Sequence, residues 1–314
     1  MLLYTVKRIG LAGLIVLVAM TMLFGMIYLV PGDPASIALG PRATPELKAA
    51  LTARMGLDQP IPVQLLNFIS GVLTGDLGVD VWSNRSVATI ILEALPYTLA
   101  LTAVGLGWSV MLGIVLGCFS ATHRGSWIDR AIGVLSVSAI AVPSFVVALY
   151  LLLVFAVALK WLPAIGAGEA DDFGDQLRHL ILPAFAIGLG WVGYIARLVR
   201  ASMLEVMGEN FIRTARAFGL PERQVVYRYA LTVAILSTVA LLGVGIGNLL
   251  SGAVFAEIVF ARPGIGKLIY DSVLNRNYPV VMGAVLVTTV LYVLATLIAD
   301  LLAALLDPRV RANF

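Results

Sequence analysis

Long apolar segments alternate with short polar ones along this chain. Six segments are nearly free of charged residues, and each has at least the ~20 residues that an α-helix needs to cross about 30 Å of hydrocarbon. They cover residues 9–30, 95–121, 131–159, 180–203, 231–256 and 280–306. Barrel strands would instead alternate apolar and polar residues over about ten positions. The pattern therefore predicts an all-α integral membrane protein with six transmembrane helices.

Composition supports this class. Of the 314 residues, 60% are apolar and 12% are charged, whereas soluble domains are about half apolar and a quarter charged. Cys118 is the only cysteine, so no disulfide can form within the chain. His123 and His179 stand apart from carboxylates with ligand spacing, and we predict no metal site.

The distribution of Lys and Arg predicts the orientation. With the N-terminus inside, the inner segments carry the higher density of positive charge, as cytoplasmic loops do. Both termini are then cytoplasmic, an N-in/C-in topology. We divide the chain into an N-terminal anchor helix, a periplasmic segment with amphipathic helices, a five-helix core that includes a cytoplasmic loop at 205–230, and a cytoplasmic tail. Their bounds are 1–30, 31–94, 95–306 and 307–314.

The polar stretch between the fourth and fifth apolar segments has a helical pattern. Residues 210–218 form a predicted helix in which Phe211, Ala215 and Phe218 share one face. Arg213 and Arg216 point the other way. The pattern predicts a narrow apolar ridge on an exposed, cationic helix.

A turn is predicted directly after this helix. Gly219 can take the left-handed conformation that ends a helix, and Leu220 leads into Pro221, which suits the first position of a second helix because it lacks an amide donor. The loop is thus predicted to be a compact helix-turn-helix.

This loop resembles the "EAA" loop of the membrane permease subunits of binding-protein-dependent ABC importers. That pattern is Glu-Ala-Ala, three residues and Gly. With its Gly on Gly219, the leading positions fall on Arg213, Thr214 and Ala215, so the Glu and the first Ala are missing. The string Asn-Phe-Ile-Arg-Thr-Ala-Arg-Ala-Phe-Gly-Leu is similar to the form in the dipeptide, oligopeptide and nickel branch.

Other strings resemble the same branch over essentially the whole chain. They are Pro-Gly-Asp-Pro at 31–34, Gly-Asp-Leu-Gly at 75–78, Arg-His-Leu-Ile-Leu-Pro at 178–183, and the segments 257–278 and 305–311. The resemblance implies a type I ABC importer permease fold and a loop helix that docks into an ATPase subunit. The residues implied in ATPase coupling are Phe211, Arg213, Thr214, Ala215, Arg216, Phe218, Gly219 and Leu220.

Polar and helix-breaking residues inside two spans are candidates for a translocation pathway. Pro143, followed by Ser144, lies in the middle of the third span, where its ring predicts a kink. Asn248 and Ser251 lie in the fifth span, where a buried amide needs a partner or a wet cavity. Helix packing is an equally good explanation for the kink at Pro143, and it is the default explanation for the small residues of the fifth span, whereas Asn248 is expected to face a cavity.

The middles of the six spans contain no ionisable residue, which argues against a proton-coupled carrier. The string from Gly264 to Lys267 fails as a phosphate loop, because Ala261 replaces the first Gly and Leu268 replaces Ser or Thr. We find no catalytic constellation and predict that the chain is not an enzyme. Energy is therefore expected from a partner, with an ion-coupled secondary carrier or a passive channel as the alternative.

The resemblance implies the partners. They are a second permease subunit, usually a paralogue, two cytoplasmic ATPase subunits that hold the ATP and Mg²⁺, and a periplasmic solute-binding protein. The chain itself is expected to have no cofactor and no nucleic-acid partner, and to sit among lipids in the bacterial inner membrane. Dipeptides, oligopeptides, glutathione and nickel chelates all stay open as substrates.

Overall fold

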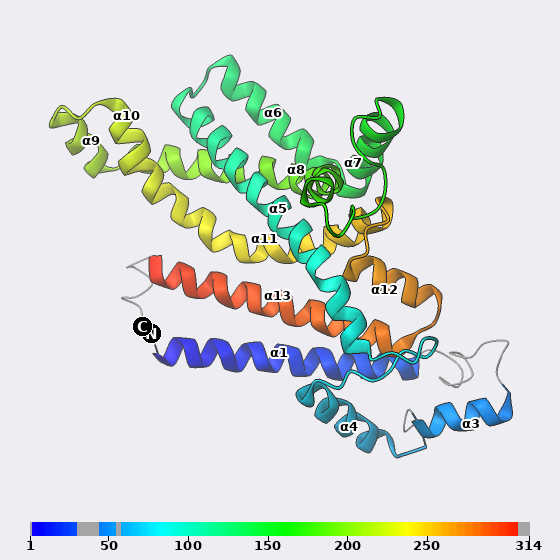
Figure 1. The fold of residues 1–314 in the computed structure, drawn as a ribbon. Coiled ribbons are helices and arrows are strands. Elements are labelled where there is room, and N and C mark those ends of the chain that lie inside the picture. Colours follow the sequence, from blue (N-terminus) through cyan, green and yellow to red (C-terminus); the bar gives the residue numbers. More distant parts are fainter. Residues whose placement is uncertain (1, 30–43, 55–57, 307–314) are drawn as a thin grey trace.

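The computed structural model describes residues 2–29, 44–54 and 58–306. Helices dominate this part of the chain, and its only β-contact is an isolated bridge between Val79 and Ser86 (Figure 1). The all-α class is confirmed. The Pro-Gly-Asp-Pro string at 31–34 and the tail at 307–314 lie outside the described residues.

The elements follow one another along the chain in the following order. They are α1 (Leu2–Leu29), α3 (Pro45–Arg54), α4 (Ile61–Thr74), α5 (Val87–Thr122), α6 (Trp127–Ala141), α7 (Ser144–Leu151), the π-helix η2 (Leu152–Ala158), α8 (Phe173–Val206), α9 (Asn210–Ala217), α10 (Glu222–Gln224), the π-helix η3 (Val225–Ala230), α11 (Leu231–Val259), α12 (Ile265–Leu274) and α13 (Tyr278–Leu306).

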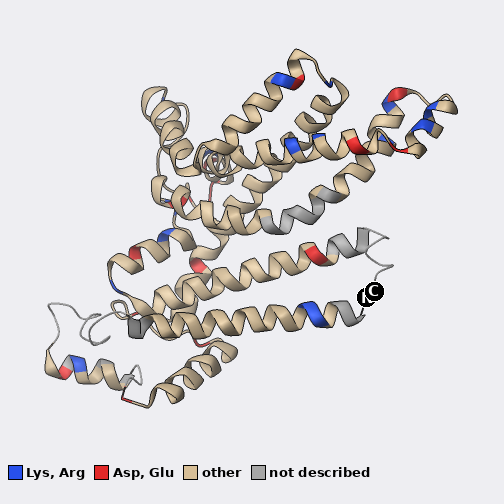
Figure 2. Ribbon diagram, turned by 180° about the vertical axis from the view of Figure 1, so that it is seen from behind, with Lys and Arg blue, Asp and Glu red and all other residues tan. Residues whose placement is uncertain are grey.

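Four helices in the described part of the chain are long and apolar enough to cross a membrane, and a bent pair makes a fifth. The four are α1, α5, α8 and α13, and the pair is α6 with α7 and η2. For α11, the apolar stretch in this test is Gly245–Val259. Figure 2 shows that acidic and basic residues lie mainly near helix ends and in the α9–α10 turn.

We expected the third span to be one kinked helix, but the structure divides it into separate helices. α6 and α7 meet at 98° across the break at Val142 and Pro143. Val142 is extended (φ −88°, ψ 121°), because a proline disfavours helical backbone at the residue before it. The proline therefore ends one helix and precedes another, so the apolar segment turns sharply.

α8 lies at the centre of the bundle and packs closely on α5 and α6. A Cβ on Gly113 would lie 2.7 Å from the Ile195 Cβ atom, and one on Gly193 would lie 2.4 Å from the Ser136 carbonyl oxygen. Small residues allow helices to approach this closely where no hydrophobic force drives them together. The three helices consequently pack almost backbone to backbone.

α1 lies beside α13 on the outside of the bundle, and α4 packs on α1 (Figure 1). Arg8 of α1 pairs with Asp300 of α13 at 2.6 Å, and the rings of Phe24 and Phe68 join α1 to α4 with centroids 6.2 Å apart. The start of α1, the end of α13 and the α9–α10 turn lie at one end of the bundle in Figure 1. α3 and α12 lie at the other end.

Candidate functional site

α9 and the turn after it protrude from one end of the bundle (Figure 1). The helix runs from Asn210 to Ala217 with Phe218 as its C-cap, and Gly219 has the left-handed φ of +75°. The Leu220 amide donates to the Ala215 carbonyl oxygen at 3.3 Å. The predicted helix stop is confirmed, while the next helix begins at Glu222, one residue later than expected, with Pro221 as its N-cap.

The apolar ridge that we predicted on α9 needs one correction. Phe218 and Phe211 are exposed, at 82% and 41% of their surface, and Thr214 is exposed beside them. Ala215 is buried, and the buried face also contains Ile212. At 100° per residue, Ala215 lies between the two phenylalanines and Ile212, and tertiary packing turns it inward. The exposed ridge therefore consists of the two phenylalanines and Thr214.

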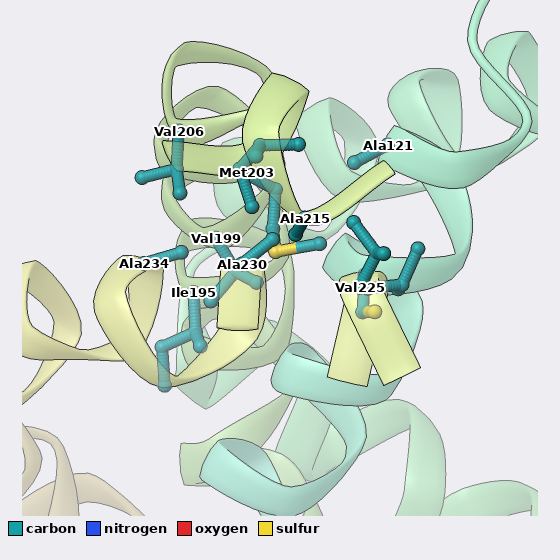
Figure 3. Close-up of a cluster of buried hydrophobic side chains, with 12 residues drawn as sticks. Ala121, Ile195, Val199, Met203, Val206, Ala215, Val225, Ala230 and Ala234 are labelled. Carbon is teal, nitrogen blue, oxygen red and sulfur yellow. The ribbon is translucent and has the colours of Figure 1, made fainter. Parts of the chain in front are cut away.

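The buried face of α9 joins a cluster that we call the coupling core (Figure 3). It brings together residues of α5, α8, α9, η3 and the start of α11. Its members are Cys118, Ala121, Ile195, Val199, Met203, Val206, Ile212, Ala215, Val225, Val226, Ala230 and Ala234. Ile212 and Val225 are fully buried. α9 is thus packed against the ends of the long helices α5, α8 and α11.

A salt bridge closes the turn between α9 and α10. Arg216 donates through Nε and Nη2 to the two carboxylate oxygens of Glu222, at 3.1 and 2.7 Å. These hydrogen bonds lower the pKa of Glu222. Arg216 therefore positions the turn, while Arg213 stays exposed on α9.

Two cavities lie on either side of α11. The first, of about 350 Å³, is lined by residues of the α6–α7 bend, α8 and α11, including Ser144, Trp191, Tyr194 and Asn248. The second, of about 390 Å³, is lined by α11, α12 and α13, including Asn248, Ser251, Thr288, Thr289 and Tyr292. Of the four pathway candidates, Ser144, Asn248 and Ser251 line a cavity, whereas Pro143 is not among the lining residues. All lining residues are uncharged.

A buried carboxylate near the end of α11 was missed by the sequence argument. Glu257 is fully buried, accepts a hydrogen bond from the Thr98 hydroxyl at 2.5 Å, and accepts another from the Lys267 amide at 3.1 Å. Gly264 and Gly266 leave the room it occupies, since a Cβ on Gly264 would lie 2.0 Å from its Oε1 atom.

The loop that failed as a phosphate site thus surrounds the carboxyl group of Glu257 at the start of α12. Arg262 lies buried nearby, with its Cζ atom 5.6 Å from the centroid of the Tyr97 ring. The sequence signal was a single acidic residue at the end of an apolar run.

Comparison with known proteins identifies the family. The model of the binding-protein-dependent transport system inner membrane component matches residues 113–312, and the model of the N-terminal part of such components matches residues 1–102. The chain belongs to this family. It is a permease subunit of an ATP-driven, binding-protein-dependent importer, and the family sets aside the alternative of an ion-coupled carrier or passive channel.

Individual relatives cover the whole chain. The glutathione transport system permease protein GsiC of Salmonella typhimurium (strain LT2) is 37% identical over 312 residues, with 99% of each chain covered. GsiC of Escherichia coli O6:H1 is 37% identical over 313 residues, again with 99% of each covered.

A solved structure shares the fold. A chain from the inward-facing MetNI methionine ABC transporter superposes with a TM-score of 0.58 at 19% identity, covering 70% of this chain and 97% of that one.

Proposed function

We propose that this chain carries a peptide or a related small solute across the bacterial inner membrane by alternating access, and that cytoplasmic ATPases drive it through α9. The observation that carries the proposal is the ridge on α9, where Phe218 is 82% exposed although the other face of the same helix is buried in the coupling core. An exposed aromatic side chain on a rigid support is typical of a residue that anchors a protein interface.

Each coupling residue has a proposed role. Phe211, Arg213, Thr214 and Phe218 contact the ATPase, with Leu220 at the edge of the contact. Ala215 seats the helix in the coupling core, Arg216 closes the turn, and Gly219 permits it. The buried face of α9 contacts the coupling core, and its exposed face contacts the ATPase. A movement of the ATPase is thereby transmitted to the long helices.

The proposed pathway runs through the two cavities beside α11. Ser144, Asn248 and Ser251 offer hydroxyl and amide groups, and Trp191 and Tyr292 offer aromatic faces. Such uncharged groups suit the amide bonds of a peptide. The relatives named for glutathione transport support the same substrate class, because glutathione is a tripeptide.

The proposed assembly contains a second permease, a paralogue of this chain, with two ATPase subunits and a periplasmic binding protein. The ATPases hold the ATP and Mg²⁺. We propose six membrane crossings with both termini in the cytoplasm. The placement of the start of α1, the end of α13 and the α9–α10 turn at one end of the bundle supports this topology (Figure 1).

A charge on the ridge tests the docking role. In the assembled importer, Phe218→Asp should abolish co-purification of the ATPases, because a carboxylate would be buried without a partner in the interface. The matched control is Phe173→Asp, because Phe173 is 73% exposed and lies at the start of α8, away from α9.

Both variants should insert in the membrane at wild-type levels. Full retention of the ATPases by Phe218→Asp, and by the double variant with Phe211→Asp, would refute the docking role of α9.

A further inference from the structure

Asp129, near the start of α6, is held by three other parts of the inner end of the bundle. Arg200 of α8 donates through Nε to Oδ1 at 2.6 Å and through Nη2 to Oδ2 at 2.8 Å. The Ser120 hydroxyl of α5 donates to Oδ1 at 2.5 Å, and the Gly125 amide donates to Oδ2 at 2.9 Å. Asp129 is 7% exposed. Paired, two-point contacts between Arg and a carboxylate fix orientation as well as distance.

The position of this ion pair relates it to the coupling segment. Arg200 belongs to the turn of α8 between Val199 and Met203, both of which are fully buried in the coupling core. α9 attaches to the same core through Ile212 and Ala215. A displacement of α9 is therefore passed to the inner end of α8, where the guanidinium is anchored.

The other end of α6 reaches the proposed pathway. Ile140, Val142 and Ser144 at the α6–α7 bend line the first cavity. Along its length α6 packs closely on α8, since the Ser136 carbonyl would lie 2.4 Å from a Cβ on Gly193. α6 thus runs from the Asp129 contact at its start to the cavity at its end.

The packing on α11 beside the cavities is different in kind. Gly245 of α11 faces the ring of Trp191, and Gly247 faces the ring of Tyr292, instead of backbone of the neighbouring helix. Asn248 lines both cavities. The contact of α11 with α13 at Gly247 therefore runs through the Tyr292 side chain, and side chains reorient far more readily than packed helices shift.

From these contacts we infer that Asp129 and Arg200 are positioning residues, which clamp α6 to α8 so that the cavity-lining bend at 140–144 moves with α9. α5, α6, α8 and α9, together with the start of α11 that packs in the coupling core, then form one rigid block that moves against α13. This inference rests on the proposed docking of α9. It explains how a movement of α9 at the ATPase contact reaches the cavities of the proposed pathway.

The first test measures solute transported per ATP hydrolysed by the complete importer in proteoliposomes, with glutathione as the probe. Asp129→Asn and Arg200→Gln should lower this ratio several-fold while ATPase activity and subunit assembly persist. Arg200→Lys keeps the charge but loses the two-point contact. Its ratio of solute transported per ATP hydrolysed should fall between those of the wild type and Arg200→Gln. The control is Arg197→Gln, which removes the same charge from an exposed position one turn earlier on α8.

Two results of this test would overturn the inference. One is a wild-type ratio in Asp129→Asn. The other is a loss of transport that equals the loss of assembled, ATP-hydrolysing complex, which would make the pair a folding contact only. Failure of α9 docking is distinguishable from both, because it removes ATPase association in the Phe218 variant whatever Asp129 does.

The second test reads the rigid block directly and does not depend on transport. Spin labels are placed at the exposed positions Trp127 and Ala217, with Cys118 replaced by serine, and their distance is measured in the complete importer with and without ATP. The 127–217 distance should stay constant, whereas the distance from 127 to a label at Leu294 of α13 should change. Asp129→Asn should make the 127–217 distance change with ATP. A 127–217 distance that changes in the wild type would refute the clamp.

Discussion

Arg216 and Glu222 show how a single pair of side chains shapes the α9–α10 turn. The hydrogen bonds from Arg216 lower the pKa of Glu222, and the same contact raises the pKa of Arg216. A carboxylate whose pKa is lowered by folding stabilises the fold above its ordinary pKa, and this contribution is lost as the pH falls through the lowered value. Both side chains are exposed, so the pair contributes about 0–1 kcal/mol.

We therefore expect Glu222→Gln to loosen the turn at neutral pH. Hydrogen exchange of the Gly219 and Leu220 amides should be faster than in the wild type at pH 7, and the difference should shrink as Glu222 is protonated in acid. Glu209→Gln is the control, because Glu209 is the N-cap residue of α9 but makes no side-chain cap hydrogen bond. An equal effect of both substitutions would contradict the assigned role of the pair.

The backbone at Gly219 leads to a second prediction. A Cβ there would meet no atom within 4 Å, so Gly219→Ala costs only the left-handed backbone, about 1–2 kcal/mol. Gly133→Ala, in α6 and also without a neighbour within 4 Å, should be neutral or slightly stabilising. In detergent, the melting temperature of Gly219→Ala should be lower than that of the wild type. A higher melting temperature would contradict the predicted cost of the left-handed backbone.

At the scale of elements, Thr98 joins α5, α11 and α12. Its hydroxyl donates to Glu257 and accepts the Ile265 amide at 2.8 Å, and both contacts are buried. Thr98→Val would leave two buried polar groups without this partner, at about 1–3 kcal/mol each. We expect a clear drop in the melting temperature of the purified protein.

The matched control for this prediction is Thr296→Val. Its hydroxyl bonds only to carbonyl oxygens of its own helix, α13. The two variants remove the same atom, so equal melting temperatures would show that the Thr98 contacts do not hold the three elements together.

At the scale of the whole molecule, several charged side chains of the described helices lie in pairs or near helix ends. Arg8 pairs with Asp300, Arg200 with Asp129, and Glu257 caps the start of α12. The cavity linings are uncharged. The residues that line the two cavities thus include no acidic or basic side chain on which an ion gradient would act.

Transport should accordingly depend on the partner subunits. In proteoliposomes, glutathione uptake should require the second permease, the ATPases, ATP and the binding protein together. The chain alone should give no flux above empty liposomes under an imposed proton or sodium gradient. Gradient-driven flux through the chain alone would overturn this view of the molecule.

Much of the local structure could be predicted from the sequence. The long apolar segments became helices, and Gly219 ended α9, since both features depend on neighbouring residues. The Glu257 carboxylate and the inward face of α9 could not be predicted. The sequence pattern placed Ala215 and Phe218 on one face, and which of them turns inward depends on which side of α9 meets the coupling core.

The sequence by itself determined the class of protein, the main helices and the polar loop, because hydrophobic period, charge density and turn chemistry act within a few residues. Tertiary structure decided the rest. The contacts of Arg200 with Asp129 span 71 positions, and the contact of Thr98 with Glu257 spans 159. Such pairs form only when distant helices meet at a particular height and rotation, and the 98° turn of α6 against α7 is likewise set by packing around the proline break.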